Sequence, residues 1–195
     1  VGFIRRFARC KGRLELRQGL PEGALHFGHI PHDARLYCVS HCWETVFHPD
    51  PSGRKLQELA HILDREEAHD QDLVFIDYCS IFQDLENTKK TELEAECSER
   101  AMIGMAKPYM FALVKTIVLP KTHEGSFSYQ TRGWAIFEQF LVTYCNRSIN
   151  AQGKGYEDSQ AIAQACKDPR RVARIHEVLL NEAYFSYEPE KRRVD

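Results

Sequence analysis

The sequence Leu36-Tyr37-Cys38-Val39-Ser40-His41-Cys42-Trp43-Glu44 passes within nine residues from an apolar run to a group of polar and aromatic side chains. A short, unbroken apolar run is typical of a strand that is buried on both faces of a parallel sheet. Polar residues directly behind such a strand lie at its carboxyl end, where open α/β sheets bind their ligands. Residues 36–39 are therefore predicted to form a strand that leads into a candidate site.

Two further apolar runs match the first, at residues 73–76, ended by Asp77, and at residues 116–119, ended by Pro120. Segments with helical spacing of apolar residues separate or follow these runs, at residues 56–63, 102–109 and 134–141. Pro108 is expected to end or kink the second helix. Strands that alternate with amphipathic helices predict an α/β fold with a central parallel sheet and helices on both of its faces.

The length of 195 residues fits one domain with short appendages. Residues 1–34 are expected to be an N-terminal extension with at most one short strand, because Pro and Gly interrupt them. Residues 35–150 are the predicted domain, and residues 86–100, rich in charge, are a solvated helix or a mobile loop. Residues 151–195 are expected to be a C-terminal helical extension packed on the same domain.

The charge balance is close to neutral, with 26 basic and 28 acidic residues. A nucleic-acid partner is therefore not expected, and no apolar run is long enough to suggest a membrane span. The seven cysteines are an odd number and scattered, which indicates reduced thiols in a cytoplasmic protein. The chain lacks an initial Met, which suggests a piece of a longer protein or a processed one.

Three segments leave the carboxyl ends of the predicted strands and should meet at one edge of the sheet. Their candidate site residues are Ser40, His41 and Trp43, then Asp77, then Arg132, Trp134 and Glu138. Trp134 and Glu138 are four residues apart and share a helix face. An indole there can stack on a flat ring, and desolvation can raise the pKa of the acid. The alternative is that Trp134 belongs to the core and Glu138 is a solvated helix charge, and the spacing leaves both open.

Other chemistries are less well supported by the sequence. Cys38, His41 and Cys42, with His48 nearby, contain metal-ligand residue types but lack the second paired half of a zinc site. No base is placed beside Cys79, which is better explained as a small buried residue. No glycine-rich phosphate-binding motif is present. Neither a metal nor a resident cofactor is expected.

Residues 37–43, 74–83 and 132–138 resemble, in this order, the three sequence blocks of heterokaryon-incompatibility (HET) domains, which are similar to Toll/interleukin-1 receptor (TIR) domains. Trp134-x-x-x-Glu138 also looks like the W-x-x-x-E element of TIR domains that cleave NAD. The resemblance covers roughly residues 35–144. It implies a three-layer, flavodoxin-like fold.

The resemblance further implies an NAD glycohydrolase in a cell-death or innate immune signalling pathway, with NAD as the substrate and self-association as a partner interaction. Glu138 matches the catalytic glutamate, and Trp134 the indole one turn before it. Ser40 and His41 match a nucleotide-facing loop, and Asp77 matches an acid that is more often structural. Whether the product is ADP-ribose, a cyclic form or a base-exchange product stays open.

Cleavage of NAD needs only one carboxylate in the site. Nicotinamide leaves as a neutral base from a cationic ring, so no general acid is needed, and the site must stabilise an oxocarbenium-like ribose. Glu138 is the candidate for this, with Trp134 stacking on nicotinamide and Arg132 or His41 near the pyrophosphate. The alternatives are a non-catalytic module that signals by homotypic assembly and, less favoured, a nucleoside-processing transferase with Glu138 as nucleophile.

Overall fold

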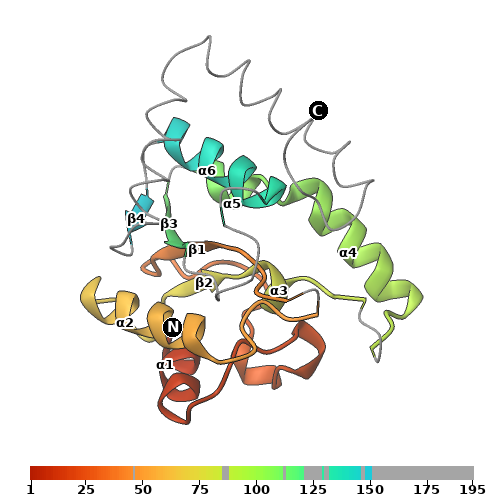
Figure 1. Ribbon diagram of the computed structural model, residues 1–195, viewed down its shortest axis with the longest axis horizontal. Helices are drawn as coiled ribbons and strands as arrows, with labels where there is room; N and C mark the ends of the chain where they lie inside the picture. Colours follow the sequence, from red (N-terminus) through yellow and green to blue (C-terminus); the bar gives the residue numbers. More distant parts are fainter. Residues whose placement is uncertain are drawn as a thin grey trace.

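The computed structural model describes residues 1–45, 47–84, 88–111, 113–120, 129, 132–145 and 148–150. Its centre is a parallel sheet with the strand order β2-β1-β3-β4 (Figure 1). The strands are β1 (Leu36–His41), β2 (Leu73–Phe75), β3 (Val114–Leu119) and β4 (Ser148–Asn150). The predicted α/β class, the parallel sheet and the first three strands are confirmed.

The helices are α1 (Gly2–Arg9), α2 (Arg54–Arg65), α3 (Asp77–Ser80), α4 (Glu92–Gly104), α5 (Lys107–Met110) and α6 (Gly133–Cys145), with 3₁₀ turns η1 (Arg17–Gly19) and η2 (Glu22–Ala24). The predicted helices near residues 56–63 and 134–141 are confirmed. The strand allowed for in residues 1–34 does not form, and α1 and the two turns stand in its place.

The segment predicted as one helix over residues 102–109 is two helices, and Pro108 is not where the first one ends. Helix α4 ends at Gly104, and Pro108 lies in the first turn of α5. A proline is tolerated there because the first-turn N–H groups have no partner within a helix. The charged segment that precedes the break forms most of α4, and its start is fixed by a capping box between Thr91 and Glu94.

The core lies on both faces of the sheet because successive strand residues point to opposite sides. On one face, Tyr37 and Val39 of β1 and Ile117 of β3 pack with buried side chains of α1 and α2. On the other face, Cys38 packs with residues of α5 and α6, namely Tyr109, Leu141 and Val142. Figure 1 shows the same arrangement, with α1 and α2 on one side of the sheet and α5 and α6 on the other.

The N-terminal segment is fastened to α2 by the buried carboxylate of Asp50. This carboxylate accepts hydrogen bonds from the backbone N–H groups of Leu14 (3.3 Å), Lys55 (2.9 Å) and Leu56 (3.1 Å). Two of these donors belong to the first turn of α2, which has no partners for them within the helix. Gly53 precedes α2 with φ of 76°, and a Cβ there would come within 2.5 Å of the Gly12 carbonyl oxygen.

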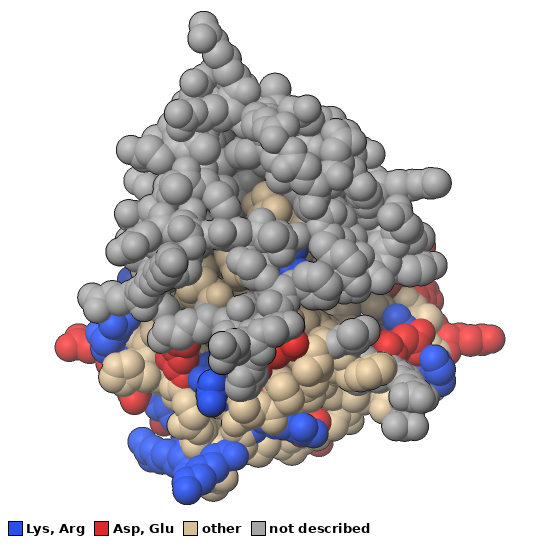
Figure 2. Space-filling model, viewed as in Figure 1, with Lys and Arg blue, Asp and Glu red and all other residues tan. Residues whose placement is uncertain are grey.

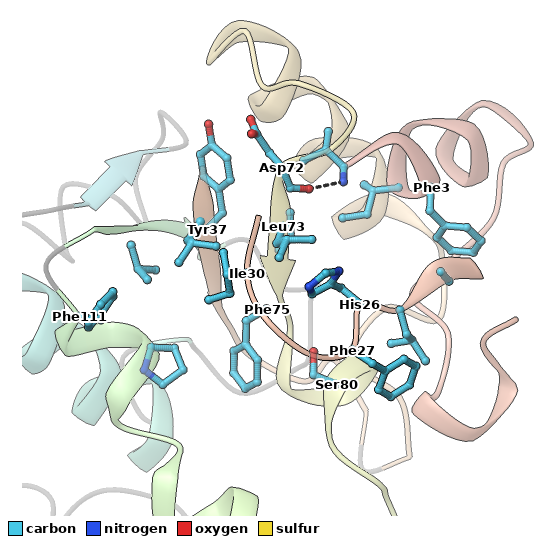
Figure 3. A pocket seen from close by; sticks show the side chains of 18 of the residues that line it. Phe3, His26, Phe27, Ile30, Tyr37, Asp72, Leu73, Phe75, Ser80 and Phe111 are labelled. Atoms are coloured by element: carbon cyan, nitrogen blue, oxygen red, sulfur yellow. Dashed lines mark hydrogen bonds between the residues drawn. The ribbon is translucent and has the colours of Figure 1, made fainter. Parts of the chain in front are cut away.

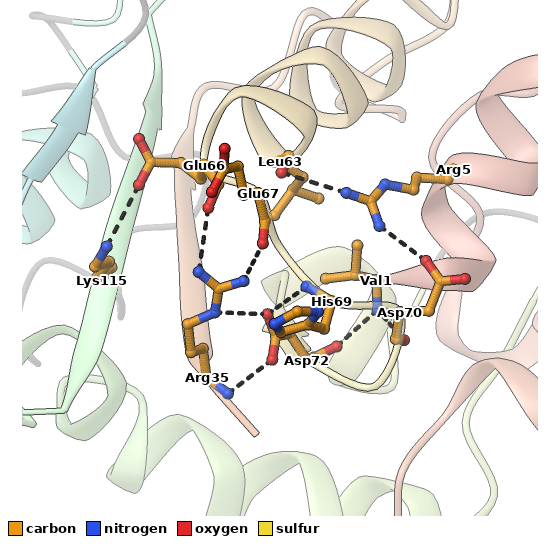
Figure 4. Close-up of polar contacts among 10 residues, drawn as sticks. All are labelled: Val1, Arg5, Arg35, Leu63, Glu66, Glu67, His69, Asp70, Asp72 and Lys115. Atoms are coloured by element: carbon orange, nitrogen blue, oxygen red, sulfur yellow. Dashed lines mark hydrogen bonds and ion pairs between the residues drawn. The ribbon is translucent and has the colours of Figure 1, made fainter. Parts of the chain in front are cut away.

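The amino ends of β1 and β2 are joined by Arg35 and Asp72 (Figure 4). The Arg35 backbone N–H and its Nε each lie 2.9 Å from the Asp72 carboxylate. The guanidinium also donates to the carbonyl oxygens of Glu66 and Glu67 at the end of α2. Arg35 thus connects the sheet to the helix that covers it.

Side chains of both charges appear on the described part of the face in Figure 2. The longest helices among the described residues, α4 and α6, have 13 residues each. None of the described helices has the length and apolarity needed to cross a membrane.

Candidate functional site

The polar residues behind the strands do meet at the carboxyl edge of the sheet. Ser40 and His41 are the last two residues of β1, and Asp77 opens α3 two residues after β2 ends. Because strand side chains alternate, Ser40 faces α6 and its neighbour His41 faces the other side. Glu138 lies in α6 and reaches this edge from above the sheet.

A chain of buried hydroxyl groups ends on Glu138. Ser40 Oγ lies 2.5 Å from Glu138 Oε2 and donates a hydrogen bond to it, and Tyr129 Oη lies 2.5 Å from Ser40 Oγ. Ser40 has one proton, so Tyr129 is the donor in the second bond. All three residues are buried. The alternative that Glu138 is a solvated helix charge is therefore wrong, because its side chain is buried against the edge of the sheet.

Tyr109 of α5 completes the surroundings of Glu138. Its hydroxyl donates to the Val39 carbonyl oxygen at 3.1 Å and is also hydrogen-bonded to Glu138. A tyrosine hydroxyl has only one proton. When it goes to Val39, the contact with Glu138 is satisfied if the carboxyl is protonated and donates to Tyr109. When the proton goes to Glu138 instead, the hydrogen bond favours the ionised carboxyl, so this contact is compatible with either form of Glu138.

The electrostatics decide between the neutral and the ionised form of Glu138. Burial and, next to it, the negative charge of Asp77 raise the pKa of Glu138 to about 8, while the hydrogen bonds of Ser40 and Tyr109 act to lower it. No Lys or Arg among the described residues forms an ion pair with Glu138. In the free protein at neutral pH, Glu138 is mostly protonated, and a cation that entered the site would favour its ionised form.

His41 and Asp77 form a second polar group at this edge. His41 Nε2 lies 2.8 Å from Asp77 Oδ1, and Asp77 also accepts hydrogen bonds from the Tyr78 backbone N–H and the Trp43 indole. Burial acts to raise the pKa of Asp77, but the contacts with His41, Tyr78 and Trp43 outweigh it, so the pKa of Asp77 is lowered. His41 Nδ1 is buried and has no hydrogen-bond partner among the described residues.

The other three predicted site residues, Trp43, Arg132 and Trp134, are only partly buried. Trp43 packs edge-on against Tyr78, with ring centroids 5.3 Å apart, so its indole is part of the loop's own packing. Trp134 is half-buried and packs edge-on against Phe137 at 5.9 Å, one turn before Glu138 in α6. Arg132 is half-buried just before α6, and its charge acts on the buried Cys42 thiol.

Two residues of the site, Tyr109 and Tyr129, could not be identified from the sequence. Tyr109 fits the apolar spacing of its helix, which gave no reason to expect a polar role. Tyr129 falls in a polar stretch of the sequence that has no apolar periodicity. Both reach Glu138 or Ser40 only through tertiary contacts, over 29 residues in one case and 89 in the other.

Thiol and metal chemistry receive no support among the described residues. Burial raises the pKa of Cys38 and of Cys42 to about 12 and that of Cys79 still further, so all three stay protonated. Cys38 Sγ lies 3.0 Å from Thr116 Oγ1, away from His41, which bonds Asp77. No group of three or more His, Cys, Asp or Glu side chains in the described part of the chain could hold a metal ion.

The edge can therefore offer one buried carboxyl group of raised pKa, a series of hydroxyl groups that hold it, and a histidine–aspartate pair beside it. Such a set of perturbed groups at the ligand-binding edge of a parallel sheet is typical of functional sites. Comparisons with protein-family models, curated proteins and solved structures found no match to this chain.

Proposed function

We propose that this protein cleaves the N-glycosidic bond of NAD and releases nicotinamide, with Glu138 as the catalytic residue. The observation that supports this most is the buried Glu138 carboxyl, held by Ser40 and Tyr109 and without an ion-pair partner among the described residues. The proposal also relies on the resemblance of the three segments to HET and TIR domains. The strand order 2-1-3-4 is the order of the first four strands in a flavodoxin-like sheet, as a three-layer TIR-like fold requires.

The cationic nicotinamide ring is the reason why a neutral Glu138 suits this reaction. An opposite charge nearby favours the ionised form of a carboxyl, so bound NAD lowers the pKa of Glu138 and the proton leaves. The carboxylate then faces the ribose, where positive charge develops as nicotinamide departs. In a dry site this interaction contributes several kcal/mol of barrier reduction.

The other residues have supporting roles in this proposal. Ser40 and Tyr109 orient the Glu138 carboxylate through their hydroxyl groups. Trp134, half-buried one turn before Glu138, stacks on nicotinamide, and Arg132 or His41 binds the pyrophosphate. Asp77 holds the His41 ring, and Trp43 fixes Asp77 through its indole N–H.

The test is to incubate the purified chain with NAD at high protein concentration and to follow nicotinamide release by chromatography. Glu138→Gln should abolish release, because the amide keeps the shape but cannot ionise. Glu99→Gln, on the exposed face of α4, is the matched control and should release nicotinamide like the unmodified chain. Equal release by Glu138→Gln would refute the catalytic assignment, and no release by any of the proteins would refute the activity.

The second candidate is a non-catalytic module that signals by self-association, and one surface feature favours it. Helix α4 exposes two large apolar side chains, Leu93 at 69% and Ile103 at 80%. Exposed apolar groups on a charged helix are a common element of protein interfaces. If the protein is such a module, light scattering should show oligomers that increase with protein concentration, and Ile103→Glu should convert them to monomers. The protein should then release no nicotinamide from NAD.

A further inference from the structure

A cavity of about 690 Å³ opens beside the edge strand β2, at the opposite end of the strands from Glu138. Its walls come from the first residues of β1, the whole of β2, helix α1, the segment 24–30, the start of α5 and Phe111 behind that helix. Figure 3 shows His26, Ile30, Leu73 and Phe75 around this space. None of the residues proposed for NAD cleavage lines the cavity.

The walls are mainly apolar, and several of them are exposed to solvent. Phe27 is 67% exposed, and Ile30 and Phe111 are 54% exposed each. Large apolar side chains gathered around one cavity on a protein surface mark a binding site more often than scattered ones do. The volume also lies within the range of about 300–1,000 Å³ that is typical of sites for small ligands.

The charged groups at the cavity are predominantly positive. Arg17 has no carboxylate partner among the described residues, and its guanidinium lies over the rings of Phe27 (5.5 Å) and Phe82 (4.8 Å). Lys107 is exposed and likewise forms no ion pair within the described part. Asp72, the one acidic residue of the described lining, is bound by Arg35 (Figure 4).

We propose that this cavity binds an amphipathic carboxylate of the fatty-acid class. Its apolar chain would lie among Ile30, Leu73 and Phe75, and its carboxylate would be attracted by the positive charge that Arg17 and Lys107 give to the lining. A peptide is the less suitable occupant, because it would bring one N–H and one C=O per residue into an apolar space. The three residues of β2 could pair only a few of these groups.

The experiment uses the complete chain and a fluorescent polyunsaturated fatty acid, cis-parinaric acid, as the probe. The probe is displaced with dodecanoate, dodecan-1-ol or dodecyltrimethylammonium, which share a chain and differ in the charge of the head group. Dodecanoate should displace the probe at a concentration about tenfold lower than the other two, the usual size of a charge-assisted contact. Native mass spectrometry should show one dodecanoate per chain.

Variants separate head-group recognition from burial of the chain. Arg17→Gln and Lys107→Glu should each lower the affinity for dodecanoate about tenfold and leave the affinity for dodecan-1-ol unchanged. Ile30→Asp should lower the affinity for both. Lys89→Glu, exposed and outside the cavity, makes the same change of charge as Lys107→Glu and should have no effect. Circular dichroism of each variant is the control for a retained fold.

Three results would overturn the proposal. The first is displacement of the probe at equal concentrations of dodecanoate, dodecan-1-ol and dodecyltrimethylammonium. The second is an equal loss of dodecanoate affinity in Lys89→Glu and Lys107→Glu. The third is no binding of the probe together with a concentration-dependent dimer that Ile30→Asp abolishes, which would assign the cavity to a second copy of the chain.

Discussion

At the scale of single residues, the most informative group is the carboxyl of Glu138, because its pKa is raised in the folded state to about 8. The folded protein therefore holds a proton between pH 4.5 and 8 that the unfolded chain has released. Stability falls as the pH rises wherever the folded state binds more protons. The stability that a protonated Glu138 provides is fully present below pH 4.5 and is lost as the pH passes through 8.

Glu138→Gln should remove this pH dependence. The amide does not titrate, so we expect the variant to lose less free energy of unfolding than the unmodified protein between pH 5 and pH 9, by on the order of a few kcal/mol. Urea unfolding at both pH values measures the difference. Glu99→Gln, at an exposed position, should follow the unmodified protein, and parallel curves for all three proteins would contradict the raised pKa of Glu138.

Ser40→Ala should move the same transition to higher pH. The Ser40 hydroxyl donates to Glu138 and thereby lowers its pKa, so its loss makes ionisation of the buried carboxyl harder. Removing one partner of a buried hydrogen bond also costs about 1–3 kcal/mol of stability. The measurement is the pH at which stability is half lost. A midpoint that moves to lower pH would show that Ser40 does not act on the charged form.

At the scale of elements, the Asp50 carboxylate stabilises the start of α2 and binds it to the N-terminal segment. Asp50→Asn keeps one carbonyl oxygen but removes the charge and places an amide against backbone donors. We expect the free energy of unfolding to fall by about 2–4 kcal/mol, because the substitution removes a helix cap and leaves a buried polar group unsatisfied. Thr91→Ala, at the capping box of the exposed helix α4, is the comparison and should cost about 1 kcal/mol. Equal losses would show that burial of Asp50 adds nothing.

The elements also show how far the sequence could predict the fold and the site. Strands β1, β2 and β3 were predictable from residues 36–39, 73–76 and 116–119, because parallel strands buried on both faces are continuous apolar runs. Strand β3 begins two residues before the predicted run. Strand β4 was not predictable, since Ser148-Ile149-Asn150 has only one apolar residue and is fixed by pairing with β3. Ser40, Asp77 and Glu138 could be predicted to converge because strand ends share an edge. Their contacts with Tyr109 and Tyr129 could not, because these arise from packing between distant segments.

At the scale of the whole molecule, the question is whether residues 1–34 unfold together with the sheet. Leu14 is buried in the same core cluster as Tyr37 of β1 and Ile117 of β3, and Ala8 of α1 is part of it. One shared core predicts a single cooperative transition, because no part of it can open without exposing the rest.

The two tryptophans of the chain allow a direct test, since Trp43 follows β1 and Trp134 lies in α6. Trp43→Phe and Trp134→Phe each leave one fluorescent reporter, and their urea transitions should coincide with each other and with the loss of helical circular dichroism. Leu14→Ala, placed in both backgrounds, should lower the two midpoints equally, at a cost of about 2–4 kcal/mol. If it lowered only the midpoint reported by Trp43, the core that Leu14 shares with β1 and the part of the molecule around α6 would be separate folding units.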